Sequence, residues 1–283
     1  MIRFDIVVIN YKRLDCFMNN FGKIVNFDND QDRVTCLTNS ASKHEKKEFY
    51  DFCQAYGIRN YRYVPHENFG IDQKARLDFF SGKTGGKDNF NSKYVCQMQD
   101  HYLDLKNPCS KWGGGDFNYS IKGDVCPDNV TFDLNEIENL FESNLLSTLY
   151  ADRGKPMKFA VGNRMFIAPD GGNFFLRTSL ILPLRTKFRL LSKTCDGSYD
   201  WALFMEYYWG ELFFEEGSKS YDYECGVYLN NYKNKDNLFK YGKEDYFSLR
   251  NRYLSSKFYP ELKRKNFLVS YIEALLRWYK NDA

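Results

Sequence analysis

The chain has 283 residues, 43% hydrophobic and 27% charged, which is enough to bury the core of one large domain or two modest ones. Forty Lys and Arg residues against 37 Asp and Glu residues leave a formal net charge of +3, so the chain lacks the strongly basic field that nucleic-acid binding requires. Its eight cysteines form no CxxC pair, which argues against a structural zinc site and favours a reducing, cytoplasmic location.

The first hundred residues alternate short apolar runs with longer amphipathic segments. The runs predict strands at 4–10, 33–38, 59–64 and 94–98, and the segments predict helices at 15–21, 43–56 and 71–80. Strands joined by crossovers of this length pair in parallel, so the pattern predicts an α/β fold with a parallel sheet between helices. The apolar run at 6–9 is too short for a signal peptide and is expected to be the first strand.

The remaining residues follow a less regular pattern. We expect a helix at 133–150, extended segments at 157–161, 164–168 and 173–176, and an aromatic-rich helix at 199–214. Residues 263–280 predict a basic amphipathic helix, which either packs on the domain or touches an anionic membrane surface as a peripheral contact. No apolar stretch approaches the roughly 20 residues that span a bilayer.

Five segments, in order, resemble the inverting nucleotide-sugar glycosyltransferases of family 2, which have the GT-A fold. They are Asn10-Tyr-Lys-Arg13 after the first strand, Thr38-Asn39 after the second, Asn68-Phe-Gly70 with Ala75-Arg76, Met98-Gln-Asp100 with Tyr102-Leu-Asp104, and Tyr199-Asp200 at a helix start. The resemblance covers residues 4–212 and implies a Rossmann-like, mainly parallel sheet flanked by helices, with a C-terminal helical extension. It divides the chain into a nucleotide-sugar half (1–110), an acceptor half of the same domain (111–235) and the extension (236–283).

The resemblance implies a site for a nucleoside diphosphate sugar, with UDP as the expected nucleotide. The residues expected to bind the nucleotide and diphosphate are Asn10, Tyr11, Arg13, Thr38, Asn39, Asn68, Gly70, Arg76 and Gln99. Thr38 stands where the family has an acid that contacts the base. Arg76 can form a bidentate pair with diphosphate, although an exposed helix position is the alternative interpretation.

The family's metal motif is present with one acid. Asp100 keeps the position that holds a divalent cation against the diphosphate, whereas Met98 replaces the other acid. His101 could add a nitrogen ligand, which favours Mn²⁺ over Mg²⁺. A metal-independent reaction is the alternative.

Asp200 stands where the family has its general base, the carboxylate that takes the proton of the acceptor hydroxyl. Tyr199 and Trp201 are expected to stack on a sugar of the glycan or glycoconjugate acceptor, in a polysaccharide-synthesis role. Aspartate at a helix start can also act as a cap alone. Two further alternatives are a noncatalytic module that binds carbohydrate or nucleic acid through its tyrosines, and a transferase that has lost its activity.

Overall fold

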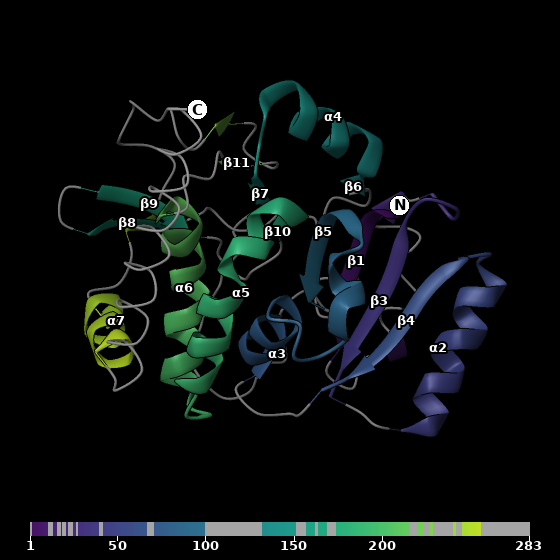
Figure 1. The fold of residues 1–283 in the computed structure, drawn as a ribbon, viewed down its shortest axis with the longest axis horizontal. Coiled ribbons are helices and arrows are strands. Elements are labelled where there is room, and N and C mark those ends of the chain that lie inside the picture. The colour runs from purple at the N-terminus through teal and green to yellow at the C-terminus, as the bar shows by residue number, and fades with distance from the viewer. Residues whose placement is uncertain are drawn as a thin grey trace, which may run out of the picture.

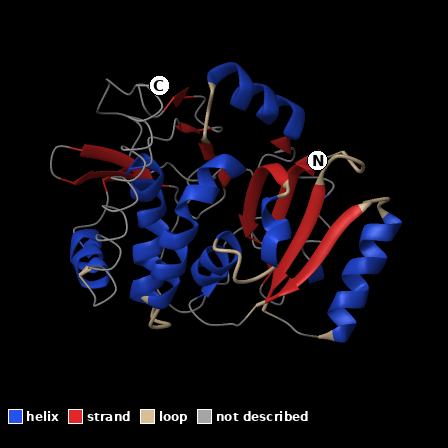
Figure 2. Ribbon diagram, viewed as in Figure 1, coloured by secondary structure: helices blue, strands red, loops and turns tan. Residues whose placement is uncertain are grey.

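A computed structural model describes residues 2–10, 14–15, 18, 21, 25–26, 28–39, 42–66, 71–99, 132–150, 157–161, 164–168, 174–215, 220–222, 227–228, 240–241 and 245–255. These residues form an α/β structure in which helices flank a mixed sheet (Figures 1 and 2). The fold class predicted from the sequence is thereby confirmed.

Four parallel strands form the first part of the main sheet. They are β1 (Ile2–Asn10), β3 (Arg33–Thr38), β4 (Asn60–Pro65) and β5 (Ser92–Gln99). Their spatial order is β4-β3-β1-β5, so the chain adds strands on one side of β1 and then returns to its other side. The four strands agree with the predicted ones to within two residues at each end.

Shorter strands extend the sheet beyond β5 and make it mixed. They are β10 (Phe174–Arg177), β7 (Thr148–Tyr150), β11 (Ser220–Asp222) and β12 (Val227–Tyr228). β10 runs antiparallel to both β5 and β7, β11 is parallel to β7, and β12 is antiparallel to β11. Strands from both halves of the chain therefore belong to one hydrogen-bonded sheet.

Two smaller sheets complete the described strands. One contains β8 (Met157–Val161), β9 (Arg164–Ala168) and β13 (Lys240–Tyr241), and the other pairs β2 (Val25–Asn26) with β6 (Phe132–Asp133). The extended segments expected at 157–161 and 164–168 form the antiparallel pair β8–β9.

Each face of the main sheet has its own hydrophobic core. On one face, alternate residues of β1 such as Val7 and Ile9 pack with α3 (Ile71–Phe80), α5 (Thr178–Lys193), α6 (Tyr199–Glu215) and α7 (Asp245–Leu254). On the other face, Ile6 and Val8 pack with α2 (Lys43–Ala55) and α4 (Leu134–Asn144). Since both faces are covered, β1 reads as a continuous apolar run rather than an alternating one.

Local signals set the bounds of α2. The Ser42 side chain accepts a hydrogen bond from the Glu45 backbone N–H at 3.4 Å and caps the first turn. Gly57 follows the helix with φ of +69°, a conformation that glycine adopts without steric cost. The predicted helix at 43–56 is confirmed to within one residue.

The helix predicted at 133–150 is wrong in its second half. α4 ends at Asn144, Leu145 takes a left-handed conformation with φ of +53°, and residues 148–150 form β7. A left-handed residue stops the helix, and pairing with β10 and β11 then draws the following residues into the sheet.

α5 is a helix of 16 residues that was not among the helices predicted from the sequence. Its buried residues Leu180, Ile181, Leu184, Phe188 and Leu191 recur at helical spacing. Pro183 interrupts this pattern in the second turn, where it removes one backbone donor.

No helix in the described ranges is both long and apolar enough to cross a membrane. The basic helix expected at 263–280 lies outside those ranges. Of the extension expected at 236–283, the structure describes β13 and α7.

Candidate active site at the carboxyl edge of the sheet

The carboxyl ends of the four parallel strands meet at one edge of the sheet. Asn10 at the end of β1 pairs with Thr38 at the end of β3, and Thr38 pairs with Pro65 at the end of β4. On the other side of β1, Ile9 pairs with Gln99, the last residue of β5. The strand order reverses between β1 and β5, and ligands of open α/β sheets bind at such a reversal.

Asn10 and Thr38 contact each other across this edge. The Asn10 Nδ2 atom donates a hydrogen bond to Thr38 Oγ1 at 3.3 Å, and both side chains are buried. The turns that follow the strands are also tied together, because Asn39 N–H donates to the Asn10 carbonyl at 3.4 Å and His66 N–H to the Thr38 carbonyl at 2.8 Å. Two residues expected to bind the nucleotide therefore lie on neighbouring strands.

The Asn39 side chain carries a buried acceptor at this edge. Its Oδ1 atom is inaccessible to solvent and has no hydrogen-bond partner within the described part of the chain. A buried acceptor without a donor costs free energy, so a side-chain shift that brings this oxygen to a donor on a ligand would be favourable.

Arg76 lies on α3 and is fully buried, so the alternative of an exposed helix residue is wrong. Its Nη2 atom lies 2.9 Å from the Asp72 carboxylate one turn earlier, and its guanidinium lies 5.5 Å from the centre of the Phe174 ring. A guanidinium is charged at any physiological pH, so its burial requires an anion beside it. Asp72 supplies that anion in this structure.

Gln97 is a buried polar residue within β5, two residues before the carboxyl end of the strand, and it was not among the expected site residues. It lies in β5 opposite Phe174 and is fully buried, yet neither atom of its amide has a hydrogen-bond partner in the described ranges. The available signal was one polar residue between Cys96 and Met98 in an otherwise apolar strand.

The start of α6 has a different cap from the one that the sequence suggested. Ser198 Oγ accepts a hydrogen bond from the Trp201 backbone N–H at 3.1 Å, so Ser198 rather than Asp200 caps the helix. The side chain of Asp200 is 54% exposed and lies 3.2 Å from the Arg252 guanidinium of α7. The carboxylate is thus accessible from solvent and does not have the capping role.

Asp196 anchors the same segment. It accepts hydrogen bonds from Ser198 Oγ at 2.5 Å and from the Tyr253 hydroxyl at 3.0 Å. Burial acts to raise the pKa of Asp196, but these hydrogen bonds outweigh it and bring the pKa below its usual range. Asp196 is therefore held in its charged form, in which it organises the loop before α6.

The two aromatic residues beside Asp200 differ. Tyr199 is 62% exposed and can present its ring to a ligand, as expected. Trp201 is fully buried and its indole N–H donates to Thr194 Oγ1 at 3.0 Å, so the expected sugar contact of Trp201 is wrong. Its large apolar ring fills the core between α6 and its neighbours instead.

Several expected site residues lie outside the described ranges. They are Tyr11, Arg13, Asn68, Gly70, Asp100 and His101, and for Gln99 only the backbone is described. The described residues contain no group of three or more His, Cys, Asp or Glu side chains that could hold a metal ion. The Mn²⁺ site therefore stays a prediction for Asp100 and His101.

Comparisons with known proteins give a structural likeness alone. The sequence matches no protein-family model, and no curated protein is similar to it. Solved structures of TarS from S. aureus align with 90% of this chain. TarS 1-349 aligns at 11% sequence identity with a TM-score of 0.42, and a longer TarS structure aligns at 10% identity with a TM-score of 0.45. The complex of TarS 1-349 with UDP-GlcNAc aligns at 10% identity with a TM-score of 0.41. The chain spans 65%, 39% and 66% of the length of these three structures.

Proposed function

We propose that this protein is an inverting glycosyltransferase that takes a sugar from a nucleoside diphosphate donor, with UDP as the expected nucleotide. The observation that supports the proposal is the reversal of strand order between β1 and β5, with Asn10, Thr38 and Asn39 at the carboxyl edge beside it. These residues belong to the segments that resemble family 2 glycosyltransferases, and the edge is where such a sheet binds nucleotides.

Each part of the proposed site has a separate role. Asn10, Thr38 and Asn39 bind the nucleotide at the ends of β1 and β3. Arg76 balances the diphosphate charge once its guanidinium turns away from Asp72, one helical turn earlier, and toward the donor. A divalent cation held by Asp100 and His101 would stabilise the charge on the leaving diphosphate.

Asp200 is the proposed general base for the acceptor hydroxyl. Its carboxylate lies in the first turn of α6, and the exposed Tyr199 beside it can stack on the acceptor sugar. Inversion follows from one carboxylate that activates the hydroxyl on the face opposite the leaving nucleotide. The acceptor is proposed to be a glycan or a glycoconjugate.

A panel of nucleotide sugars tests the proposal. Slow hydrolysis of one UDP-sugar or GDP-sugar, in the presence of Mn²⁺ and without acceptor, is the expected result. Absence of turnover with every donor, together with no detectable UDP or GDP binding by calorimetry, would refute it.

The base assignment needs its own pair of variants. We expect Asp200→Asn to abolish transfer and to keep donor affinity within about twofold, because the variant loses the base but no donor contact. Asp51→Asn removes an exposed carboxylate on α2, which pairs with Lys47, and serves as the control, with turnover retained. Undiminished transfer by Asp200→Asn would contradict the role of Asp200.

A further inference from the structure

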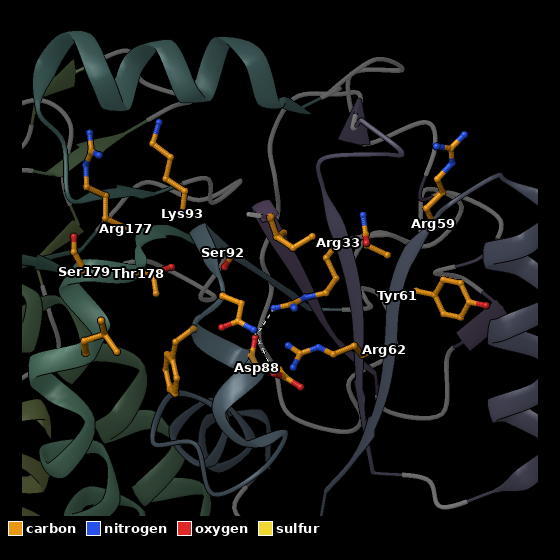
Figure 3. A pocket seen from close by; sticks show the side chains of 15 residues that line it. Arg33, Arg59, Tyr61, Arg62, Asp88, Ser92, Lys93, Arg177, Thr178 and Ser179 are labelled. Carbon is orange, nitrogen blue, oxygen red and sulfur yellow. Dashed lines mark hydrogen bonds between the residues drawn. The ribbon is translucent and has the colours of Figure 1, made fainter.

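A cavity lies at the opposite edge of the sheet from the proposed donor site. Its volume is about 970 Å³, and its walls include Ile2, Arg33, Asn60 and Ser92, which are the first residues of β1, β3, β4 and β5. Thr178, the first residue of α5, closes another side of it. Figure 3 shows Arg33, Ser92 and Thr178 among the side chains that line it. We call this cavity the amino-edge pocket.

Positive charge predominates in the walls of the amino-edge pocket. The basic residues that line it are Arg33, Arg59, Arg62, Lys93 and Arg177, and the acidic residue among the lining is Asp88. Several of the basic groups already have partners outside the lining: Arg59 pairs with Asp30, Lys93 with Glu138 and Glu142, and Arg177 with Glu142.

Two arginines of the lining contact one buried carboxylate. Arg33 Nη2 and Arg62 Nη2 lie 2.6 and 2.8 Å from the same oxygen of Asp5, a fully buried carboxylate. Two guanidinium groups thus share one carboxylate beneath the pocket floor. The Asp88 carboxylate also attracts the Arg62 guanidinium, so the excess of positive charge comes from the wider basic lining of the pocket.

Three polar atoms in the walls have no hydrogen-bond partner in the described part of the chain. They are Arg33 Nε, Ser92 Oγ and Thr178 Oγ1, and the three residues are only 7%, 4% and 5% exposed. Ser92 and Thr178 both line the pocket, where β10, which leads into α5, pairs with β5 at Arg177 and Tyr94 (Figure 3). Buried donors without acceptors are costly, and a small rotation of each side chain toward the pocket would let these atoms donate to ligand oxygens.

The start of α5 adds further donors. Arg177 at the N-cap position makes no side-chain capping hydrogen bond, and the first turn contains no acidic residue. The first backbone N–H groups of a helix have no acceptor within the helix, and the positive end of its dipole favours an anion. Arg177, Thr178, Ser179 and Leu182 all line the pocket, so this helix start opens into it.

We propose that the amino-edge pocket binds the phosphate group of a small organic molecule. A phosphate offers several terminal oxygens to the unpartnered donors and to the start of α5. The volume is that of pockets for drug-sized ligands and far exceeds one phosphate ion. Ile2, Phe90 and Leu182 supply apolar contacts for the organic part. The site is separate from the proposed donor site and does not depend on the proposed function.

Backbone amide chemical shifts of the full chain test the proposal with two probes, inorganic phosphate and phenyl phosphate. Saturable shifts at Ser92 and at residues 178–180 are expected for both, with tighter binding of phenyl phosphate. Shifts confined to residues 38–39 and 72–76 would overturn the inference, because they report the carboxyl edge instead. Weaker binding of phenyl phosphate than of phosphate would overturn the organic part of the ligand.

Hydroxyl deletions supply the second readout. Thr178→Val and Ser92→Ala should each raise the phosphate Kd at least about tenfold, the loss typical of one hydrogen bond to a charged group, without lowering the denaturation midpoint. Ser192→Ala is the matched control on α5, because its buried hydroxyl already donates to Asp78 at 2.6 Å. That variant should be less stable and bind phosphate normally. Unchanged phosphate affinity in both Thr178→Val and Ser92→Ala would refute the site.

Discussion

Gln97→Met is the perturbation whose outcome follows most directly from the structure. The Gln97 side chain is fully buried, and its Oε1 and Nε2 atoms have no hydrogen-bond partner in the described ranges. A buried polar group in this state costs about 1–3 kcal/mol, since its hydrogen bonds to water are lost and not replaced. Methionine has the same unbranched length and removes both polar atoms. We therefore expect the free energy of unfolding to rise by about 1–3 kcal/mol.

Gln73→Met is the matched control for the same chemical change. Gln73 is also buried, but its Oε1 atom accepts a hydrogen bond from the Trp209 indole N–H at 2.7 Å. Methionine would leave that indole donor buried and unpaired, which costs about 1–3 kcal/mol. The two variants thus change the same atoms in the same core layer and should shift stability in opposite directions.

Urea unfolding, followed by circular dichroism and tryptophan fluorescence, measures both effects. Coincident transitions and equal m-values among the three proteins are required, because a changed m-value signals a different unfolded state. A loss of stability in Gln97→Met comparable to that in Gln73→Met would refute the reasoning, since it would show that the Gln97 amide has a favourable partner in the folded protein.

Three further perturbations have defined outcomes. Hydrogen bonding, chiefly from Tyr94, lowers the pKa of Glu142 from 4.5 to about 2. The stabilising contribution of Glu142 is therefore present above about pH 4.5 and is lost as the pH falls toward 2. Acid unfolding of Glu142→Gln should lack this component, and an acid transition identical to that of the unmodified protein would contradict the assignment. Arg250→Gln leaves the buried Glu211 without its ion pair and should lower the free energy of unfolding in urea by about 3–5 kcal/mol. The ion pair of Arg252 is exposed, so Arg252→Gln should lower it by less than about 1 kcal/mol. Equal losses of stability in the two variants would refute the distinction. Burial raises the pKa of the Cys53 thiol to about 12, so iodoacetamide at pH 7.5 should leave Cys53 unmodified until urea unfolds the protein, as mass spectrometry would report.

The sequence predicted the parallel half of the fold well because its signals are local. An apolar run of β1, a serine cap and a terminal glycine for α2, and a helical period in α3 each specify their element within a few residues. The helix predicted at 133–150 failed where a single residue, Leu145, takes a left-handed conformation and later strands recruit residues 148–150. Pairing between distant strands is a tertiary effect that no local pattern contains.

For the candidate site, too, the sequence predicted some residues correctly and could not predict the burial of others. The order of the motif segments led to Asn10, Thr38 and Asn39, and the register of β1 with β3 brings them together. Burial was not readable from the motif: Arg76 and Trp201 are both enclosed, although an exposed position was one alternative for the first and a sugar contact was expected of the second. Side-chain exposure depends on which helices cover the sheet, and α5 was missed altogether.

By itself, the sequence determined the α/β class, the parallel strands and the residues that stand at their carboxyl ends. Hydrophobic period, capping residues and turn residues act within a few positions along the chain, so they can be read in order. The tertiary structure alone decided which polar groups lack partners among the described residues, as with Gln97 and Thr178, and it alone formed the amino-edge pocket from four strand starts and one helix start. Those properties arise between residues far apart in sequence, where hydrogen bonding and burial are set by packing.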